Sequence, residues 1–182
     1  MESFVGLEVE QSEEGIALHL DTYIQELIEE YRKLHRNYIK PKKVPMVPGL
    51  VLEKEDCPPV PDPFKQTVFR SVVAKIQFAA HWVRFDISYP AAQLARFCVS
   101  AGPSHWAALT HLIGYLIHRP SLKLKYRREK LGDLDGFTDS DWGNSLSQKS
   151  TTGLLARYNR GLILWRSKMQ KTVALSSAEA EY

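Results

Sequence analysis

The 182 residues carry 24 Lys and Arg against 21 Asp and Glu, a net charge of +3, and 44% of them are hydrophobic. This ordinary globular composition excludes wholesale disorder, and Cys57 and Cys98 are too few for a disulfide scaffold. No apolar run approaches the roughly 20 residues that cross a bilayer, and the N-terminus lacks the pattern of a signal peptide.

The first forty residues predict a β-hairpin followed by a helix. Two short apolar runs, FVGLEVE and GIALHL, flank the polar stretch QSEEG, in which Gly15 can take a positive φ within the turn. Asp21 then opens a helix as its N-cap. The apolar residues that follow recur at helical spacing and form one stripe: Ile24, Leu27, Ile28, Tyr31 and Leu34.

The middle of the chain predicts a linker and then a helical region. Seven of the ten prolines lie between Pro41 and Pro63, too many for a helix or a central strand, so residues 41–65 are interpreted as a surface linker. Three helices should follow within residues 66–120. The second and third begin near Asp86 and Ser104, and the apolar stripe of the third contains Trp106, which we expect in the core.

After Pro120 the hydrophobic period shifts towards two, which is typical of strands. LKLKY alternates, DGFTDSDW and TGLLARY are strand-like, and GLILWRS follows YNRG, a hairpin signal through Asn159 and Gly161. These segments predict a three-stranded antiparallel meander that leads into a helix at Ser176. The fold class is therefore α+β: a β-hairpin, a helical segment and a meander. One apolar face of the meander should have little to cover it, with these candidates: Leu154, Ala156, Leu162 and Leu164.

Acidic residues in FTDSDW and at the chain end are the candidate metal ligands. Two hard cations in a phosphodiesterase site need several oxygen ligands, and Glu179 or Glu181 on the last helix can bring a second carboxylate to the strand that bears Asp139. From spacing alone the competing interpretation is stronger. Carboxylates in a turn or a first helical turn are more often solvated or partners of the helix dipole.

Two segments favour the interpretation as metal ligands: GFTDSDWGNSLSQKSTTG and LILWRSKMQKTVALSSAEAEY. From Gly136 to Tyr182 they closely resemble the opening of the ribonuclease H domain in the Pol polyprotein of copia-type long-terminal-repeat retrotransposons. Upstream, FVGLEVE, YIQELIEEY and FRSVVAKIQFAAHWVRFDISYPAAQLARF resemble the end of the reverse transcriptase of the same elements. The resemblance implies four segments: residues 1–40, the end of the palm and thumb; 41–65, the linker; 66–120, the thumb and connection; 121–182, the N-terminal part of ribonuclease H.

The resemblance also implies roles for individual residues. The first catalytic aspartate of the family falls on Asp139 and its catalytic glutamate on Glu179, and both would ligate Mg²⁺. Asp141 is expected to be supporting or solvated, and Glu181 to point away from the metal. The backbone around Gly6 would approach the primer terminus closely, because glycine has no side chain.

Basic residues between the helical segment and the meander are the candidate nucleic-acid contacts. The run LKLKYRREK holds five cations, which either meet the phosphates of a hybrid duplex or only solubilise a strand: Lys123, Lys125, Arg127, Arg128 and Lys130. The polymerase motif Tyr-x-Asp-Asp and the later nuclease aspartates have no counterpart in the sequence. We therefore expect a window cut from a longer polyprotein, and the sequence leaves open whether a pseudogene's stop codon, a gene-model boundary or the choice of expressed segment made it.

Two functional hypotheses follow from these residues. In the first, the chain is a fragment of a reverse transcriptase and ribonuclease H polyprotein, with an ancestral role in holding an RNA–DNA hybrid and cutting its RNA strand with Mg²⁺. In the second, it is a remnant or binding module with no catalysis and at most weak affinity for nucleic acid. In both, the partners are nucleic acid and the rest of the Pol polyprotein, with no membrane. The expected location is intracellular, in a cytoplasmic particle, the nucleus or both.

Overall fold

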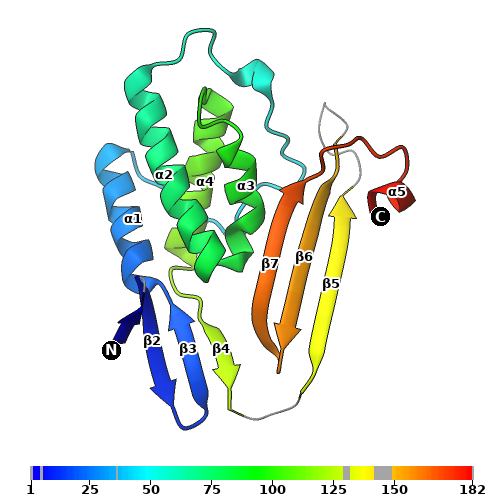
Figure 1. The fold of residues 1–182 in the computed structure, drawn as a ribbon. Helices are drawn as coiled ribbons and strands as arrows, with labels where there is room; N and C mark the ends of the chain where they lie inside the picture. Colours follow the sequence, from blue (N-terminus) through cyan, green and yellow to red (C-terminus); the bar gives the residue numbers. More distant parts are fainter. Residues whose placement is uncertain (1, 5, 36, 129–131, 142–148, 182) are drawn as a thin grey trace. The chain divides into compact units, whose positions relative to one another are not determined.

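The computed structural model describes residues 2–4, 6–35, 37–128, 132–141 and 149–181. Helices and antiparallel strands alternate in blocks along these ranges, so the α+β class is confirmed (Figure 1). The chain divides into two compact units. We call Leu20–Leu122 the helical unit, and Met1–His19 with Lys123–Tyr182 the β unit.

The helical unit packs four α-helices around one apolar core. Its elements are α1 (Asp21–Leu34), the short 3₁₀ helices η1 (Lys54–Asp56) and η2 (Phe85–Ile87), α2 (Pro63–Trp82), α3 (Ser88–Ala95) and α4 (Pro103–His118). The stripe predicted for α2 is buried, and it meets the buried faces of α1, α3 and α4 through these residues: Ile24, Phe69, Val72, Val73, Ile76, Leu94, Leu109 and Ile113. Burial of this apolar surface drives the assembly of the helices.

The helix starts show where sequence patterns succeed and fail. Asp62, not predicted as a cap, accepts hydrogen bonds at Oδ1 from the backbone N–H groups of Phe64 and Lys65, 2.9 and 3.1 Å away. The prediction that the third helix of residues 66–120, which is α4, begins with Ser104 as its cap is wrong. The residue before α4 is Gly102, where an added Cβ would lie 1.6 Å from the carbonyl oxygen of Asp56, so this close contact requires glycine. Ser104 lies inside the helix and donates to Asp56.

The proline-rich segment packs against α4 and forms hydrogen bonds with it. The backbone N–H of Lys42 donates to the carbonyl of Gly114, and Nε2 of His111 lies 3.0 Å from the carbonyl oxygen of Val44. Leu52 within the segment is buried. Residues 41–65 therefore belong to the helical unit and do not form a free linker.

A four-stranded antiparallel sheet opens the β unit. Its strands are β1 (Glu2–Phe4), β2 (Leu7–Ser12), β3 (Gly15–His19) and β4 (Leu124–Arg127), in that order. The predicted β2–β3 hairpin is confirmed, and Gly15 has a φ of 154°. A Cβ at Gly15 would lie 2.1 Å from the carbonyl oxygen of Tyr126, so only glycine allows β4 to pair with β3. The strand LKLKY thus joins the hairpin, although it is far away in sequence.

The predicted meander forms a second antiparallel sheet. It contains β5 (Leu134–Asp141), β6 (Thr151–Tyr158) and β7 (Gly161–Met169), followed by α5 (Ser177–Glu181). Asn159 and Arg160 both have positive φ in the β6–β7 turn, as a two-residue type I′ turn requires.

An apolar face of this sheet stays open, as the pattern predicted. Leu154 and Leu164 are 39% and 50% exposed. Leu162 differs from the prediction, since it is buried, and its carbonyl accepts a 2.7 Å hydrogen bond from the hydroxyl of Tyr126. The contact joins the two sheets of the β unit.

Candidate functional site

Asp139 lies near the end of β5, directly opposite Gly153 of β6. Successive side chains of a strand point to opposite faces, so Asp139 lies on the face opposite to that of Thr138 and Ser140. Its side chain is exposed. A Cβ added at Gly153 would meet nothing closer than the Asp139 carbonyl oxygen, 3.7 Å away. Open space therefore lies over Gly153, opposite Asp139 in the sheet.

Glu179 lies in the first turn of α5 and takes part in the start of that helix. Its backbone N–H donates to Oγ of Ser176 over 3.1 Å, and its carboxylate accepts a 2.7 Å hydrogen bond from the N–H of Leu175. Reciprocal bonds of this kind satisfy two N–H groups that the helix start leaves without partners. The sequence SSAE is thus a self-contained helix start, which holds the Glu179 carboxylate at a defined position.

A polar pocket of about 460 Å³ lies between α5 and the meander, and we call it the α5 pocket. Gln170 fastens α5 there, because its Nε2 donates to the carbonyl of Ala180 and to Oγ1 of Thr152. Charged and hydroxyl side chains from the sheet and the helix line the pocket: Thr138, Ser140, Thr152, Lys168, Lys171, Glu179 and Glu181. Oγ of Ser140 is buried and has no hydrogen-bond partner in the described part of the chain.

The two carboxylates implied by the resemblance belong to elements that contact one another, but they do not line the same pocket. α5 contacts β5, yet Asp139 is not among the residues that line the α5 pocket, whereas Glu179 and Glu181 both are. Carboxylate and hydroxyl oxygens are the donors that Mg²⁺ prefers. Within the described ranges, however, no three His, Cys, Asp or Glu side chains come close enough to hold a metal ion together.

The basic residues of β4 are not equivalent. Leu124 and Tyr126 face inward, whereas Lys125 and Arg127 alternate with them and are exposed. Lys123 forms an ion pair with Glu10, 2.5 Å away, and this hydrogen bond lowers the pKa of the Glu10 carboxyl.

The remaining candidates lie at the ends of elements. Arg128 is exposed beyond β4, and its N–H donates to the carbonyl of Glu14. Lys130 lies outside the described residues. Gly6 lies in the turn between β1 and β2 with a φ of 80°, so the turn itself accounts for the glycine.

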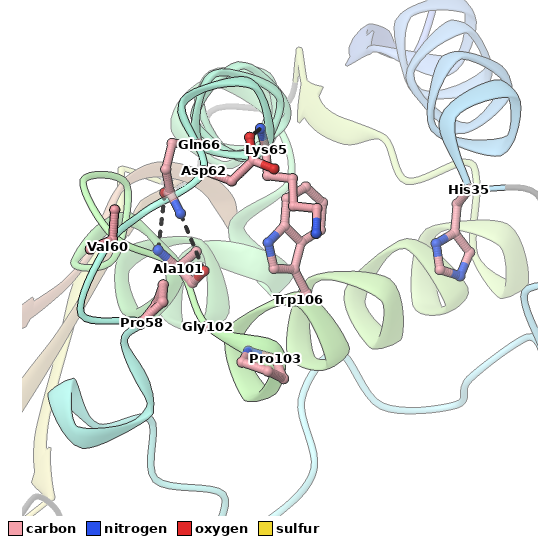
Figure 2. A pocket seen from close by; sticks show the side chains of 10 residues that line it. All are labelled: His35, Pro58, Val60, Asp62, Lys65, Gln66, Ala101, Gly102, Pro103 and Trp106. Carbon is pink, nitrogen blue, oxygen red and sulfur yellow. Dashed lines mark hydrogen bonds between the residues drawn. The ribbon is translucent and has the colours of Figure 1, made fainter.

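The helical unit contains a groove that the sequence patterns did not predict. Two pockets, of about 580 and 460 Å³, share His35 and Trp106 (Figure 2 shows the larger), and we call them together the Trp106 groove. Trp106 is half-buried, so the prediction that it belongs to the core is wrong. Residues after α1, from the proline-rich segment, from α2 and from α4 come together here: Tyr38, Lys40, Lys42, Pro58, Val60, Lys65, Pro103 and His111. The sequence feature that could have indicated this groove is the clustering of prolines before α2.

No helix in the described part of the chain is long and apolar enough to cross a membrane.

Sequence comparison finds relatives of this chain among known proteins. No family model and no solved structure matches it. The chain is 37% identical over 119 residues to secreted RxLR effector protein 161 of Plasmopara viticola, covering 65% of this chain and 84% of that protein. It is 31% identical to the retrovirus-related Pol polyprotein from transposon RE1 of Arabidopsis thaliana, covering 98% of this chain and 12% of that protein. It is 30% identical to a putative transposon Ty5-1 protein of Saccharomyces cerevisiae, covering 100% of this chain and 58% of that protein.

The matches to the Pol polyproteins and to the Ty5-1 protein extend over nearly all of the chain and confirm the resemblance seen in its terminal motifs. They also show that the chain corresponds to only a small part of the longest relatives. The chain belongs to the family of retrovirus-related Pol polyproteins of retrotransposons.

Proposed function

We propose that this chain is the part of a copia-type Pol polyprotein that holds an RNA–DNA hybrid and contributes Asp139 and Glu179 to Mg²⁺-dependent cleavage of the RNA strand. The observation that supports this most is the arrangement at the end of β5. The strand that carries Asp139 contacts the short helix that carries Glu179 and follows the meander. The helical unit then corresponds to the thumb and connection of the reverse transcriptase.

The side chains suit this role through binding and positioning. Lys125 and Arg127 project from β4, where they can contact phosphates without reading the sequence of the bases. The hydrogen bond from Leu175 orients the Glu179 carboxylate, and the space beside Gly153 admits an ion or a phosphate to Asp139. Asp139 and Glu179 would hold Mg²⁺, which lowers the pKa of a bound water and stabilises charge on the scissile phosphate.

The 182 residues by themselves should cleave slowly or not at all. The two-metal chemistry of nucleases needs both ions held rigidly by several ligands, and the described residues hold no group of three. Further carboxylates from elsewhere in a Pol polyprotein would complete the site.

A second candidate function is binding of nucleic acid without catalysis. It is favoured because Glu179 lines the α5 pocket and Asp139 does not, whereas carboxylates that share a metal must point to one place. The exposed cations on β4 are sufficient for weak binding that depends on salt.

The test uses an RNA–DNA hybrid with labelled RNA, in Mg²⁺, and two proteins. One is the 182-residue chain, and the other is this chain joined to the rest of a ribonuclease H domain from a Pol relative. We expect the joined protein to cut the RNA and the chain alone to be slower by several orders of magnitude. Asp139→Asn and Glu179→Gln should abolish cutting by the joined protein and leave hybrid binding largely unchanged. Asp135→Asn, on the same strand and face as Asp139, is the matched control.

Two results would contradict the proposal in different ways. Strong cleavage by the 182-residue chain, lost in Asp139→Asn, would show that the chain needs no further ligands. A joined protein that binds the hybrid but whose cleavage is unaffected by both substitutions would leave only the binding function.

A further inference from the structure

The Trp106 groove has features that neither the family assignment nor the proposed cleavage site explains. It lies wholly within the helical unit, between α4, the residues after α1 and the proline-rich segment. Its larger pocket is lined mainly by apolar surface from Pro58, Val60, Pro103 and Trp106 (Figure 2). A groove of this volume that remains open is suited to a ligand with flat apolar groups.

Two polar side chains that line the groove are already satisfied within the protein. Gln66 donates from Nε2 to the carbonyl of Ala101 and accepts at Oε1 from its N–H, 3.2 and 3.0 Å away (dashed in Figure 2). Asp62 accepts two backbone N–H groups at the start of α2. Neither group needs a ligand, so these two side chains impose no hydrogen-bond pattern on one.

Trp106 is a partly exposed ring held in a fixed orientation. Its edge packs on Phe69, with ring centroids 5.2 Å apart at 70°. Oγ1 of Thr110 donates to the carbonyl of Trp106 and is itself 2.8 Å from the hydroxyl of Tyr31. Tyr31 also stacks on the ring of His35, the other residue shared by both pockets. Since the rings are ordered before any ligand binds, stacking on them costs little conformational entropy.

The charges along the groove are mostly positive. Lys65 lines one pocket, and Lys40 and Lys42 line the other. Among the residues that line the groove, Asp62 is the one carboxylate. The aromatic rings of His35, Tyr38 and Trp106 therefore line the same groove as three cations, and the complementary ligand combines flat rings with negative charges.

We propose that a single-stranded RNA segment binds in the Trp106 groove, with bases stacked on Trp106 and Tyr38 and phosphates near Lys40, Lys42 and Lys65. Aromatic platforms beside cations bind single strands without sequence preference, because every base offers a π-face. A duplex does not fit this chemistry, since its bases already stack on one another. The groove contains none of the residues assigned to hybrid cleavage. The RNA-binding proposal therefore does not depend on that assignment.

The experiment measures anisotropy of a fluorescein-labelled U12 RNA bound to the full chain, over a range of salt concentrations. Trp106→Leu and Tyr38→Ala should each weaken binding about tenfold, as expected for loss of one stacked base. The matched control is Trp82→Leu, another partly exposed tryptophan of the helical unit that lies outside the groove. Lys65→Ala should reduce the slope of log K against log salt by about 0.7, whereas exposed Lys33→Ala should not.

The same measurements are made with the exposed cations of β4 and the adjacent Arg128 replaced, as Lys125→Ala, Arg127→Ala and Arg128→Ala together, so that these cations do not contribute to the measured binding. Tyr38 is 85% exposed, so its substitution tests the groove even if Trp106→Leu disturbs folding. U12 affinity that is unchanged in both aromatic variants would overturn the proposal. It would also be overturned if a glutamate- and tryptophan-rich peptide bound through Trp106 and U12 RNA did not, because the groove would then accept an acidic protein segment.

Discussion

Replacing Asp86 by asparagine should strongly destabilise the helical unit. Arg84 is 1% exposed, and its guanidinium forms two parallel hydrogen bonds with the carboxylate of Asp86, at 2.9 and 2.8 Å. The hydroxyl of Tyr115 donates to the same carboxylate over 2.8 Å. In Asp86→Asn the guanidinium of Arg84 stays buried beside a neutral amide. An NH₂ group replaces one of the two carboxylate oxygens, and it faces the N–H and O–H donors of Arg84 and Tyr115.

The size of the effect follows from burial. Removing one partner of a buried ion pair leaves an uncompensated charge and costs about 3–5 kcal/mol. For a unit of this size, that corresponds to a fall in Tm of more than about 10 °C. Urea unfolding followed by far-UV circular dichroism measures the free energy directly.

The chain offers a matched control for this measurement. Arg157 and Asp135 form a comparable pair, 3.1 Å apart, but both side chains are 41% exposed. Exposed pairs contribute about 0–1 kcal/mol, so Asp135→Asn should have little effect. If Asp86→Asn changed the free energy of unfolding by no more than this control, the argument from burial would be refuted.

Three further predictions concern His105, Gly15 and α5. Burial lowers the pKa of His105 below its ordinary 6.5, so the stability of the helical unit should be complete above about pH 6.5 and decline as the pH falls towards the lower folded value. Unfolding measured against pH should show this loss, and His105→Gln should remove it. Gly15→Ala should destabilise the β unit by more than about 1 kcal/mol, because its Cβ would overlap the Tyr126 carbonyl; equal melting temperatures would contradict the β3–β4 register. Ser176→Ala should cost α5 about 1 kcal/mol, seen as faster hydrogen exchange at Ala180, whose N–H bonds to the Ser176 carbonyl. Unchanged exchange would argue against the cap.

Much of the helical unit and of the meander was predictable because the signals are local. The apolar stripes from Ile24 to Tyr31 and from Phe69 to Ile76 follow the period of a helix. The apolar residues that form these two stripes are buried. The β6–β7 hairpin was predicted from Asn159 and Gly161, and Asn159 does take a positive φ, but the second positive φ of the turn falls on Arg160. The family assignment came from the run ending in SSAEAEY, in which residue order alone identifies relatives.

The candidate sites depended on contacts between residues that are distant in sequence. The pairing of β4 with β3 joins Leu124 to Leu18, and no local pattern contains that partner. The partial exposure of Trp106 depends on where the proline-rich segment lies on α4. The apolar stripe of α4 does not by itself show which of its residues that segment covers.

By itself the sequence determined the α+β class, the helix faces and membership of the Pol family, because these depend on periodicity and on the order of residues. The tertiary structure alone decided that Arg84 is buried against Asp86, that Asp139 and Glu179 do not line the same pocket, and that Trp106 lines a groove. The physical reason is that burial and the direction of a side chain depend on what packs against it. Here those neighbours come from segments up to about a hundred residues away, as the hydrogen bond from Ser121 to Asp21 illustrates.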